Sequence, residues 1–351
     1  MTVAIESFAV VESDEAWDEL VTRCGGELFH TSAWLDILRT AFDVRLARIG
    51  LLEGMDLVAG MPVMLRRRAG FVLAGSPLPD IVTPQMGMVC RDPCHIPRML
   101  DGLEAALRRN HVAFCRIVFS TDVPSESLVE RGYRLDEYRS PILNLRGKSE
   151  DAVWKGFEGR ARTAVRKAEQ SGVEVTAATD LVFLGPYRDM ATAVYAKRRR
   201  RPPDRDAFLR LLWSKLAPLD AVRVFLAKID GELLAAAVIA RHGTTGYYLD
   251  GVSRPEFNRL GANSLLQWRA IQWLMSLGIE RYDMVGAGIP EIARFKRSFG
   301  SDVELRAEAM KATSLPARAG LAGYRTFAPL LRKLIFQAGK VPERLRSANL
   351  E

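Results

Sequence analysis

Cysteine and histidine are both scarce in this chain, with four residues of each among 351. Four scattered cysteines are too few to hold together a disulfide scaffold of this length, so a disulfide-rich secreted fold is excluded. Cys90, Cys94 and His95 lie close together, but a structural zinc site needs a second ligand pair and none is obvious. We therefore expect ordinary thiols and no metal.

Long apolar runs are also missing. No window approaches about 18 uninterrupted apolar residues, so the sequence predicts no membrane-spanning helix. The first 15 residues carry Glu12, Asp14 and Glu15 and lack the apolar stretch of a secretory signal. These features favour a cytoplasmic protein.

The charge balance is basic overall, but the excess is moderate and unevenly spread. Lysine and arginine exceed aspartate and glutamate by 50 − 42 = 8, and residues 155–215 hold 14 basic and 7 acidic side chains. A local positive field favours a phosphate-bearing partner such as a nucleotide, a tRNA or an anionic lipid head group. A solvated arginine-rich face explains the same excess, so both interpretations stay open.

The length exceeds what one hydrophobic core usually covers, so two domains are expected. A polar junction at residues 148–151 separates residues 1–147 from residues 148–312, and residues 313–351 form a tail. Residues 324–338 are apolar on one face with Arg332, Lys333 and Lys340 nearby. We expect a docked C-terminal helix there, the alternative being peripheral contact with an anionic membrane surface.

Hydrophobic periodicity and turn residues predict a mixed α/β chain. In the first half, helices are expected to start at residues 13 and 31 and to cover residues 96–110, with strands at residues 45–52, 57–65, 71–74, 113–120 and 139–145. In the second half we expect helices at residues 153–171, 184–200, 206–217 and 261–278, and strands at residues 173–177, 223–229, 232–241, 244–250 and 280–285. Each half therefore follows the element order of an acetyltransferase-like unit.

Several stretches resemble the Fem family of peptidoglycan-bridge aminoacyltransferases, within the GNAT acyltransferase superfamily. In the second half they are residues 161–175, 246–253, 261–268, 282–288 and, most tellingly, 294–300, which read Arg-Phe-Lys-Arg-Ser-Phe-Gly. Residues 29–34 and 75–80 also fit. The order and spacing of these stretches carry the resemblance, which spans residues 25 to 305.

The resemblance implies two tandem GNAT-like domains with mixed sheets. It also implies transfer of an aminoacyl group from aminoacyl-tRNA, as co-substrate rather than bound cofactor, to an amine. The acceptor would be a cell-wall precursor or a secondary metabolite, that is, an amine-bearing small molecule or a nucleotide-linked acceptor. The sequence has no room for the coiled-coil arm with which most bridge-forming members bind tRNA.

Amide formation requires a deprotonated amine, a stabilised oxyanion and two substrates held together. By the resemblance, Phe295 and Lys296 lie where the carbonyl is attacked, and an ammonium in a low-dielectric site can stabilise the oxyanion. Asp80 and Asp283 are candidates for the proton, and each could instead be structural. A reactive aminoacyl ester can also dispense with a dedicated base.

Phosphate and acceptor contacts are expected from basic and aromatic side chains. Arginine forks suit phosphates, and which arginine beside Pro202-Pro203 corresponds to the diphosphate-holding arginine of similar proteins stays open. Tyr247 and Tyr248 alternate faces of a strand, so only one can line a cleft. The candidates are Arg199, Arg201, Arg205, Arg294, Arg297, Tyr247, Tyr248, Trp34 and Arg39.

The alternative donor is an acyl-CoA or an acyl carrier. CoA-dependent GNAT enzymes cradle pyrophosphate at a glycine-rich turn before a long helix. The matching place holds Gly261, Ala262 and Asn263, where one glycine remains and the spacing departs from the usual pattern. This departure weakens the CoA interpretation. A third hypothesis is a non-catalytic nucleotide- or RNA-binding module that retains the fold.

Overall fold

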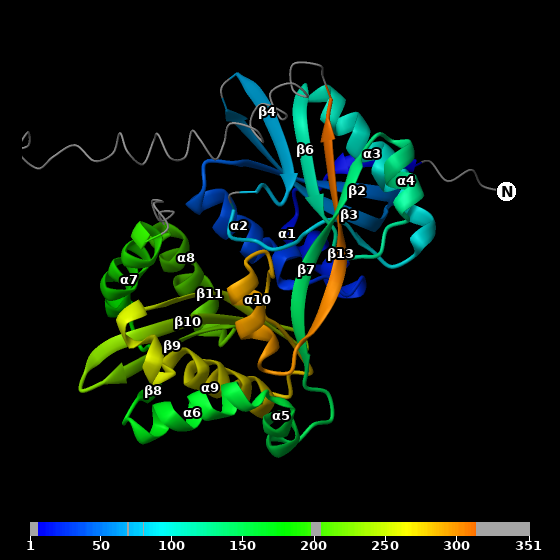
Figure 1. The fold of residues 1–351 in the computed structure, drawn as a ribbon. Helices are drawn as coiled ribbons and strands as arrows, with labels where there is room; N and C mark the ends of the chain where they lie inside the picture. The colour runs from blue at the N-terminus through cyan, green and yellow to red at the C-terminus, as the bar shows by residue number, and fades with distance from the viewer. Residues whose placement is uncertain (1–5, 69, 80, 198–204, 314–351) are drawn as a thin grey trace, which may run out of the picture.

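The computed structural model describes residues 6–68, 70–79, 81–197 and 205–313 (Figure 1). Asp80, Arg199, Arg201 and the tail from residue 314 lie outside these described residues. No helix within them is long and apolar enough to cross a membrane.

The first half of the chain combines a sheet with helices on both faces. Its elements are β1 (Glu6–Val10), α1 (Asp14–Arg23), α2 (Ser32–Ala41), β2 (Arg45–Glu53), β3 (Asp56–Arg68), β4 (Phe71–Ser76), β5 (Val89–Cys90), α3 (Ile96–Arg109), β6 (Val112–Val118), α4 (Ser125–Glu130) and β7 (Arg134–Asn144). Ser13 accepts a hydrogen bond from the Ala16 amide and so caps α1, as its sequence position predicts.

The second half repeats this arrangement and ends in a helix and a strand. Its elements are α5 (Glu150–Gly156), α6 (Gly159–Gln170), β8 (Glu174–Ala177), α7 (Leu184–Lys197), α8 (Asp206–Leu216), β9 (Val222–Ile229), β10 (Glu232–His242), β11 (Thr245–Ser253), a 3₁₀ helix η5 (Pro255–Leu260), α9 (Ala262–Ser276), β12 (Arg281–Asp283), α10 (Pro290–Arg297) and β13 (Asp302–Ala312).

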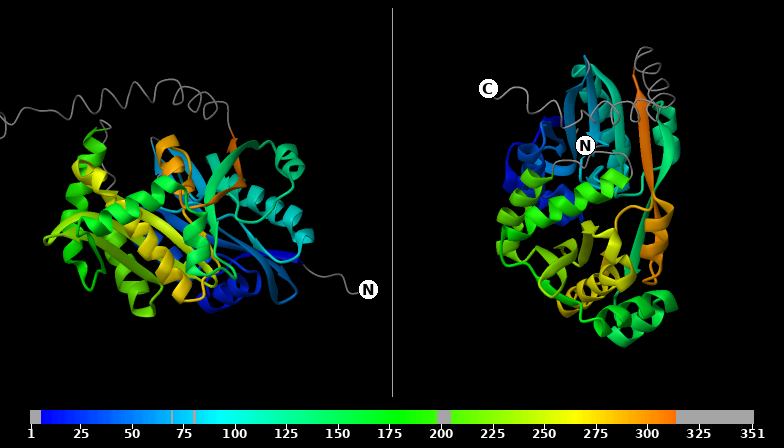
Figure 2. Two further views of the ribbon diagram at one scale, coloured as in Figure 1. Left: turned by 60° about the horizontal axis from the view of Figure 1, so that its bottom comes forward. Right: turned by 60° about the vertical axis from the view of Figure 1, so that its left-hand side comes forward.

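The strands of both halves form one mixed sheet of 13 strands in the described residues. Its order is β1-β2-β3-β4-β6-β13-β7-β12-β11-β10-β9-β8, with β5 paired to β3. The last strand, β13, lies between β6 and β7 of the first half, and both views in Figure 2 show it beside β7. The predicted division at residue 147 thus stays a prediction, but residues of the second half complete the sheet of the first.

Three hydrophobic cores hold the helices to the sheet. One core is shared by both halves, because Trp17, Phe29 and Trp34 of the first half pack with Phe208 and Tyr247 of the second. A second core joins α5, α6 and α9 to the other face of the second half, and a third joins α3 and α4 to the first half. The shared core fixes the relative position of the halves by burying large apolar side chains.

Two predictions of secondary structure are wrong in an instructive way. Residues 153–171 form two helices instead of one, because Phe157 turns into the core against Trp268 and Phe299. The second is an omission, because β1, β5, α4, α10 and β13 are not among the predicted elements. Most other predicted helices and strands lie within a few residues of their observed bounds.

Candidate active site

Strands β11 and β12 diverge in the middle of the molecule. They pair in parallel only where Thr245–Tyr247 lies beside Arg281–Asp283. Beyond this point β11 continues with a bulge at Leu249, whereas the Met284 amide donates to the Pro141 carbonyl of β7, 2.9 Å away. The next residue, Val285, then turns the chain with a φ of 53°. The divergence leaves backbone carbonyls free to bind side chains.

Lys296 occupies this divergence. Its ammonium donates hydrogen bonds to the carbonyl oxygens of Val285 and Gly286, the latter 3.0 Å away, and lies 5.5 Å from the centre of the Tyr248 ring. Only 6 % of the residue is exposed. Burial lowers the pKa of Lys296 to about 8, against the opposing charges of Asp283 and Asp250. The side chain therefore places a positive charge in a largely water-excluded site.

The short helix α10 holds Lys296 in this position. Pro290 begins the helix, where a missing backbone N–H costs nothing. At its end, Phe295 packs edge-on against the buried Phe299 with ring centres 5.2 Å apart. Gly300 follows with a φ of 76°, and a Cβ there would lie 2.8 Å from the Gly156 carbonyl oxygen. Pro290 thus fixes the start of α10, and the packing of Phe299 and Gly300 fixes its end. The helix lies against β7 (Figure 1).

Asp283 is fully buried at the end of β12. Its carboxylate accepts hydrogen bonds from the Ser140 hydroxyl and from the Val285 amide, 2.8 Å away. Its other oxygen accepts from Arg306 at 3.1 Å and, at the longer distance of 3.5 Å, from the Gln85 amide. A general base needs an accessible lone pair. These contacts make Asp283 a structural anion, which does not support the proton-accepting role considered from the sequence.

Arg205 and Asp250 form a second charged pair near Lys296. Arg205 directly precedes α8, and its guanidinium donates to the Asp250 carboxylate on β11. Both side chains are largely buried, which strengthens their attraction. The buried Tyr187 lies beside the same carboxylate, and this carboxylate together with burial raises the pKa of its hydroxyl. Arg205 is therefore tied to β11 in this structure.

The aromatic candidates divide between core and site. Tyr247 is buried with its ring 4.8 Å from that of Phe29, whereas Tyr248 faces Lys296. Trp34 is completely buried and donates through its indole N–H to the Thr83 hydroxyl at 3.2 Å. Tyr247 and Trp34 therefore lie in the core of this structure, and Tyr248 is the aromatic candidate that lies beside Lys296.

Arg39 lies on the surface away from this charged group. Its guanidinium pairs with Asp36 one helical turn earlier on α2, and 62 % of its side chain is exposed. Asp36 also pairs with Lys215 of α8 at 2.7 Å. Arg39 therefore lies in a surface ion cluster where the two halves meet.

The start of α9 is closed on one side. Gly261 has a φ of 80°, and a Cβ at this position would lie 2.2 Å from the carbonyl oxygen of Ala164 on α6. Ala262 is buried and Asn263 is half-buried. This close approach explains the retained glycine by helix packing, without requiring a pyrophosphate at the turn.

A basic surface adjoins Lys296. Arg294 and Arg297 are exposed on α10, and Arg160 of α6 donates to the Arg294 carbonyl oxygen at 2.6 Å. Lys167 of α6 and Arg259 of η5 are exposed on the same half. Exposed cations at the end of α10 suit a polyanion that approaches the buried ammonium.

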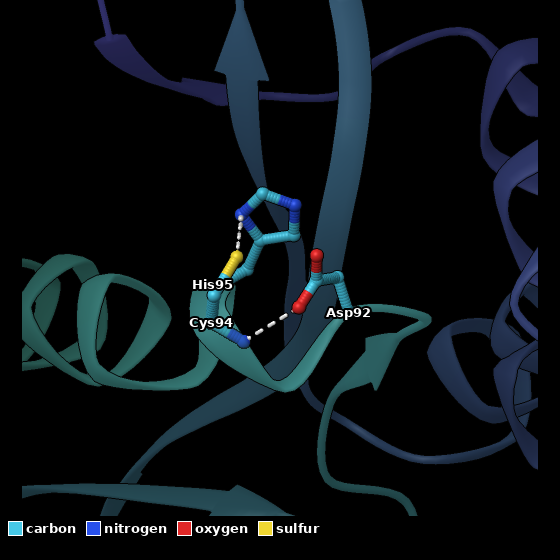
Figure 3. Close-up of side chains that lie close together, drawn as sticks. All are labelled: Asp92, Cys94 and His95. Carbon is cyan, nitrogen blue, oxygen red and sulfur yellow. Dashed lines mark hydrogen bonds between the residues drawn. The ribbon is translucent and has the colours of Figure 1, made fainter.

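Asp92, Cys94 and His95 form a separate cluster at the start of α3 (Figure 3). Their potential metal-ligating atoms all lie within 4.8 Å of one another, beside a pocket of about 560 Å³. The Asp92 carboxylate already accepts from the Cys94 amide at 2.9 Å, and an Arg98 nitrogen lies 3.4 Å from Nδ1 of His95. The guanidinium and the positive end of the helix both oppose a cation here.

Comparison with known proteins defines the class of this fold. Residues 156–297 match the family model described as an acetyltransferase (GNAT) domain. The matched stretch lies in the second half of the chain and includes Lys296. No curated protein matches the sequence.

Solved structures extend the similarity to both halves. The crystal structure of FemX covers 88 % of this chain and 98 % of its own, with 14 % identity and a TM-score of 0.71. L-PGS from Bacillus licheniformis covers 88 % and 96 %, with 14 % identity and a TM-score of 0.57. A tandem GNAT protein from the clavulanic acid biosynthesis pathway covers 88 % and 99 %, with 13 % identity and a TM-score of 0.54. The predicted resemblance to Fem-like proteins is thus confirmed in the fold.

Sequence reasoning missed the polar residues that surround Asp283. Gln85 and Glu27 come from the first half, and Arg306 comes from the unpredicted strand β13. None of them belongs to a recognisable motif. Asp250 could have been found, because it is a charged residue inside a predicted strand and within the Fem-like stretch at residues 246–253.

Proposed function

We propose that this chain is an acyltransferase that moves an aminoacyl group from aminoacyl-tRNA to an amine acceptor and forms an amide. The observation that carries the proposal is the buried ammonium of Lys296 where β11 and β12 diverge. The GNAT domain and the FemX-like fold support acyl transfer, and the Fem resemblance points to aminoacyl-tRNA as donor. We further propose two GNAT-like units, at residues 1–147 and 148–312.

The hydrogen bonds of Lys296 suggest how the ammonium takes part. An ammonium has three N–H donors, and two of them go to the carbonyls of Val285 and Gly286. We assign the third donor to the oxygen of the ester carbonyl under attack. As the acceptor nitrogen bonds to the carbonyl carbon, negative charge develops on that oxygen and the ammonium stabilises it. Phe295 excludes water at this point.

The leaving group and the proton of the attacking amine can both be accounted for without a dedicated base. When the tetrahedral intermediate collapses, the ester C–O bond breaks and the hydroxyl oxygen of the terminal tRNA ribose leaves. This alkoxide takes the proton that the attacking nitrogen must lose, directly or through water. The buried Asp283 is consequently not needed for proton transfer. Asp80, which lies outside the described residues, remains a candidate for this role.

The basic surface is the proposed contact for the donor. Arg294 and Arg297 on α10 and Arg160 on α6 would hold phosphates of the tRNA acceptor end, because guanidinium groups bind phosphates in a bidentate manner. Arg205, Arg199 and Arg201 remain candidates for a diphosphate on the acceptor. Arg205 would then have to exchange its contact with Asp250 for the substrate.

A transfer assay tests the proposal. Radiolabelled charged tRNA and radiolabelled acyl-CoA are each offered with a panel of amines, including nucleotide-linked cell-wall precursors. We expect an amide product from charged tRNA only, lost on RNase treatment and in the Lys296→Met variant. The exposed Lys148→Met variant serves as a matched control and should keep full activity. Transfer from acyl-CoA that withstands RNase would contradict the proposal.

Acyl-CoA is the second candidate donor, because the matching family model describes an acetyltransferase domain. The tight packing of Gly261 on Ala164 weighs against it, since the start of α9 is where such enzymes place pyrophosphate. Protection of the protein against thermal unfolding by CoA, but not by tRNA, would favour this candidate.

A further inference from the structure

The left-handed turn after β12 shapes the carbonyl pair that binds Lys296. Val285 has a φ of 53° and Gly286 a φ of 64°. A β-branched residue such as valine is disfavoured in this region of backbone conformation. The Val285 amide donates to the Asp283 carboxylate at 2.8 Å, which offsets this cost and fixes the turn. The direction of both carbonyls therefore depends on where Asp283 is held.

Residues of the first half help to hold Asp283. Ser140 on β7 donates to its carboxylate, and the Gln85 side-chain amide lies 2.7 Å from Glu27 and 3.5 Å from Asp283. Glu27 belongs to the first half as well. The carboxylate of the second half thus rests against side chains of the first.

Arg306 on β13 completes the arrangement. Its guanidinium lies 3.1 Å from the Asp283 carboxylate and 3.6 Å from that of Glu27, and only 7 % of its side chain is exposed. The arginine faces two carboxylates, and burial raises the pKa of Glu27 because an ionised carboxyl there is poorly solvated. Among these groups Asp283 makes the most contacts, and all of them restrict its orientation.

We propose that Asp283 is a positioning residue for Lys296: held by Ser140, Gln85 and Arg306, it fixes the Val285–Gly286 turn whose carbonyls orient the ammonium. The inference deepens the proposed function, on which the role of Lys296 in catalysis rests. It explains why the reacting group of the second half needs the first half, although neither Asp283 nor Arg306 touches a substrate. It assigns Asp283 a role different from that of a general base.

Competitive labelling of lysines with trace acetic anhydride tests this positioning without any substrate. The labelling rate of Lys296 is followed against pH by mass spectrometry, with Lys311 as internal reference because it is paired with Glu104 at 2.6 Å elsewhere in the fold. In Asp283→Asn we expect Lys296 to label about five-fold faster at neutral pH, because the carboxylate contacts that hold the Val285–Gly286 turn are weakened and the carbonyls of this turn orient the ammonium less firmly. The pH midpoint of labelling should fall, because the negative charge beside the ammonium is gone.

Two further variants keep the test decisive. Ser140→Ala removes one donor to Asp283 with little loss of volume and should change Lys296 in the same direction by a smaller factor. Asp302→Asn removes an exposed carboxylate at the start of β13 and should change nothing. If Asp283→Asn does not fold, Ser140→Ala decides.

The outcomes separate positioning from general stability and from the proposed function. Faster labelling of Lys296 with unchanged Lys311 in Ser140→Ala, which keeps the charge of Asp283, supports the inference, whereas a rise confined to Asp283→Asn reports only the lost charge and contradicts it. Unchanged Lys296 in the folded variants, or an equal rise at both lysines, overturns it. If Lys296 responds as expected but no transfer from any donor is found, the proposed function fails while the positioning by Asp283 stands.

Discussion

The ammonium nitrogen of Lys296 lies 5.5 Å from the centre of the Tyr248 ring, so an aromatic face and two carbonyls surround one cation. The ring replaces part of the solvation that the ammonium loses on burial. Such a contact is worth about 1 kcal/mol, which corresponds to less than one pKa unit. Tyr248 thus belongs to the site through its ring and not through its hydroxyl.

Replacing the Tyr248 ring should change the titration of Lys296. We expect Tyr248→Leu to lower the pKa of Lys296 further below about 8, because the cation loses its aromatic partner. Tyr248→Phe keeps the ring and should leave the pKa unchanged. Nuclear magnetic resonance titration of ¹³C-methylated lysines measures both. An equal shift in the two variants would assign the effect to the hydroxyl instead.

The rate of transfer should depend on the charge of Lys296. The proposed oxyanion contact requires the ammonium, so the rate should decline as the pH rises through about 8. The pH profile of kcat measures this descending limb, with the Tyr248→Leu variant expected to move it to lower pH. A rate that instead rises through about 8 would indicate that the neutral amine of Lys296 acts as a base.

Lys296 should also impose a pH dependence on stability. Its pKa falls from 10.5 to about 8 on folding, so between these values the unfolded chain binds more protons than the folded one. The contribution of Lys296 to the free energy of unfolding should therefore rise with pH across this window, by at most about 3 kcal/mol. Buried thiols and phenols with raised pKa values, such as that of Cys115, oppose this rise, so the contribution is read as the difference between the wild type and Lys296→Met. Urea unfolding of both proteins at a series of pH values measures this difference, and a difference that does not change with pH would contradict the lowered pKa of Lys296.

Trp34 and Arg39 lie only five positions apart in α2, but their substitution should affect stability very differently. Trp34 is completely buried in the shared core, so Trp34→Ala should cost about 3–5 kcal/mol of stability. Arg39→Ala removes an exposed ion pair and should change stability by about 0.5 kcal/mol or less. Chemical denaturation measures both. A stable Trp34→Ala variant with impaired substrate binding would instead support the substrate-binding role predicted for Trp34.

Two glycines with the same backbone geometry separate close packing from backbone strain. Gly261 and Gly278 have φ values of 80° and 70°, but only Gly261 has a neighbouring atom within 4 Å of an added Cβ. Gly278→Ala should cost about 1 kcal/mol from the left-handed backbone alone. Gly261→Ala should cost clearly more, because it pushes α9 away from Ala164. Equal losses of stability in the two variants, measured by thermal unfolding, would argue against the tight contact between α6 and α9.

Local signals in the sequence predicted local structure well. The Ser13 cap forms where the predicted helix begins, and Asp230-Gly231, which lies between the strands predicted at residues 223–229 and 232–241, forms a turn in which both residues have positive φ. The helix break at Phe157 could not be predicted, because it depends on Trp268 and Phe299, which are more than 100 residues away. The same holds for β13, whose partners Val118 and Ile142 are far from it in sequence.

The candidate site was predictable only in part. The Arg-Phe-Lys stretch predicted Lys296 as a site residue. The carbonyl groups that bind Lys296 are positioned by a backbone turn, and no pattern of side chains predicts this turn. The contacts of Asp283 come from three separate segments, so its anchoring role became visible only in three dimensions.

The insertion of β13 between β6 and β7 has a consequence for biosynthesis. A ribosome makes residues 302–312 long after the flanking strands have emerged, and until then those strands present two unpaired edges in place of one continuous sheet. The sheet of the nascent first half therefore stays incomplete, and prone to association with other chains, until a segment near the end of the described residues has been made. Genetic separation of the halves would leave the first half without the strand that joins β6 to β7.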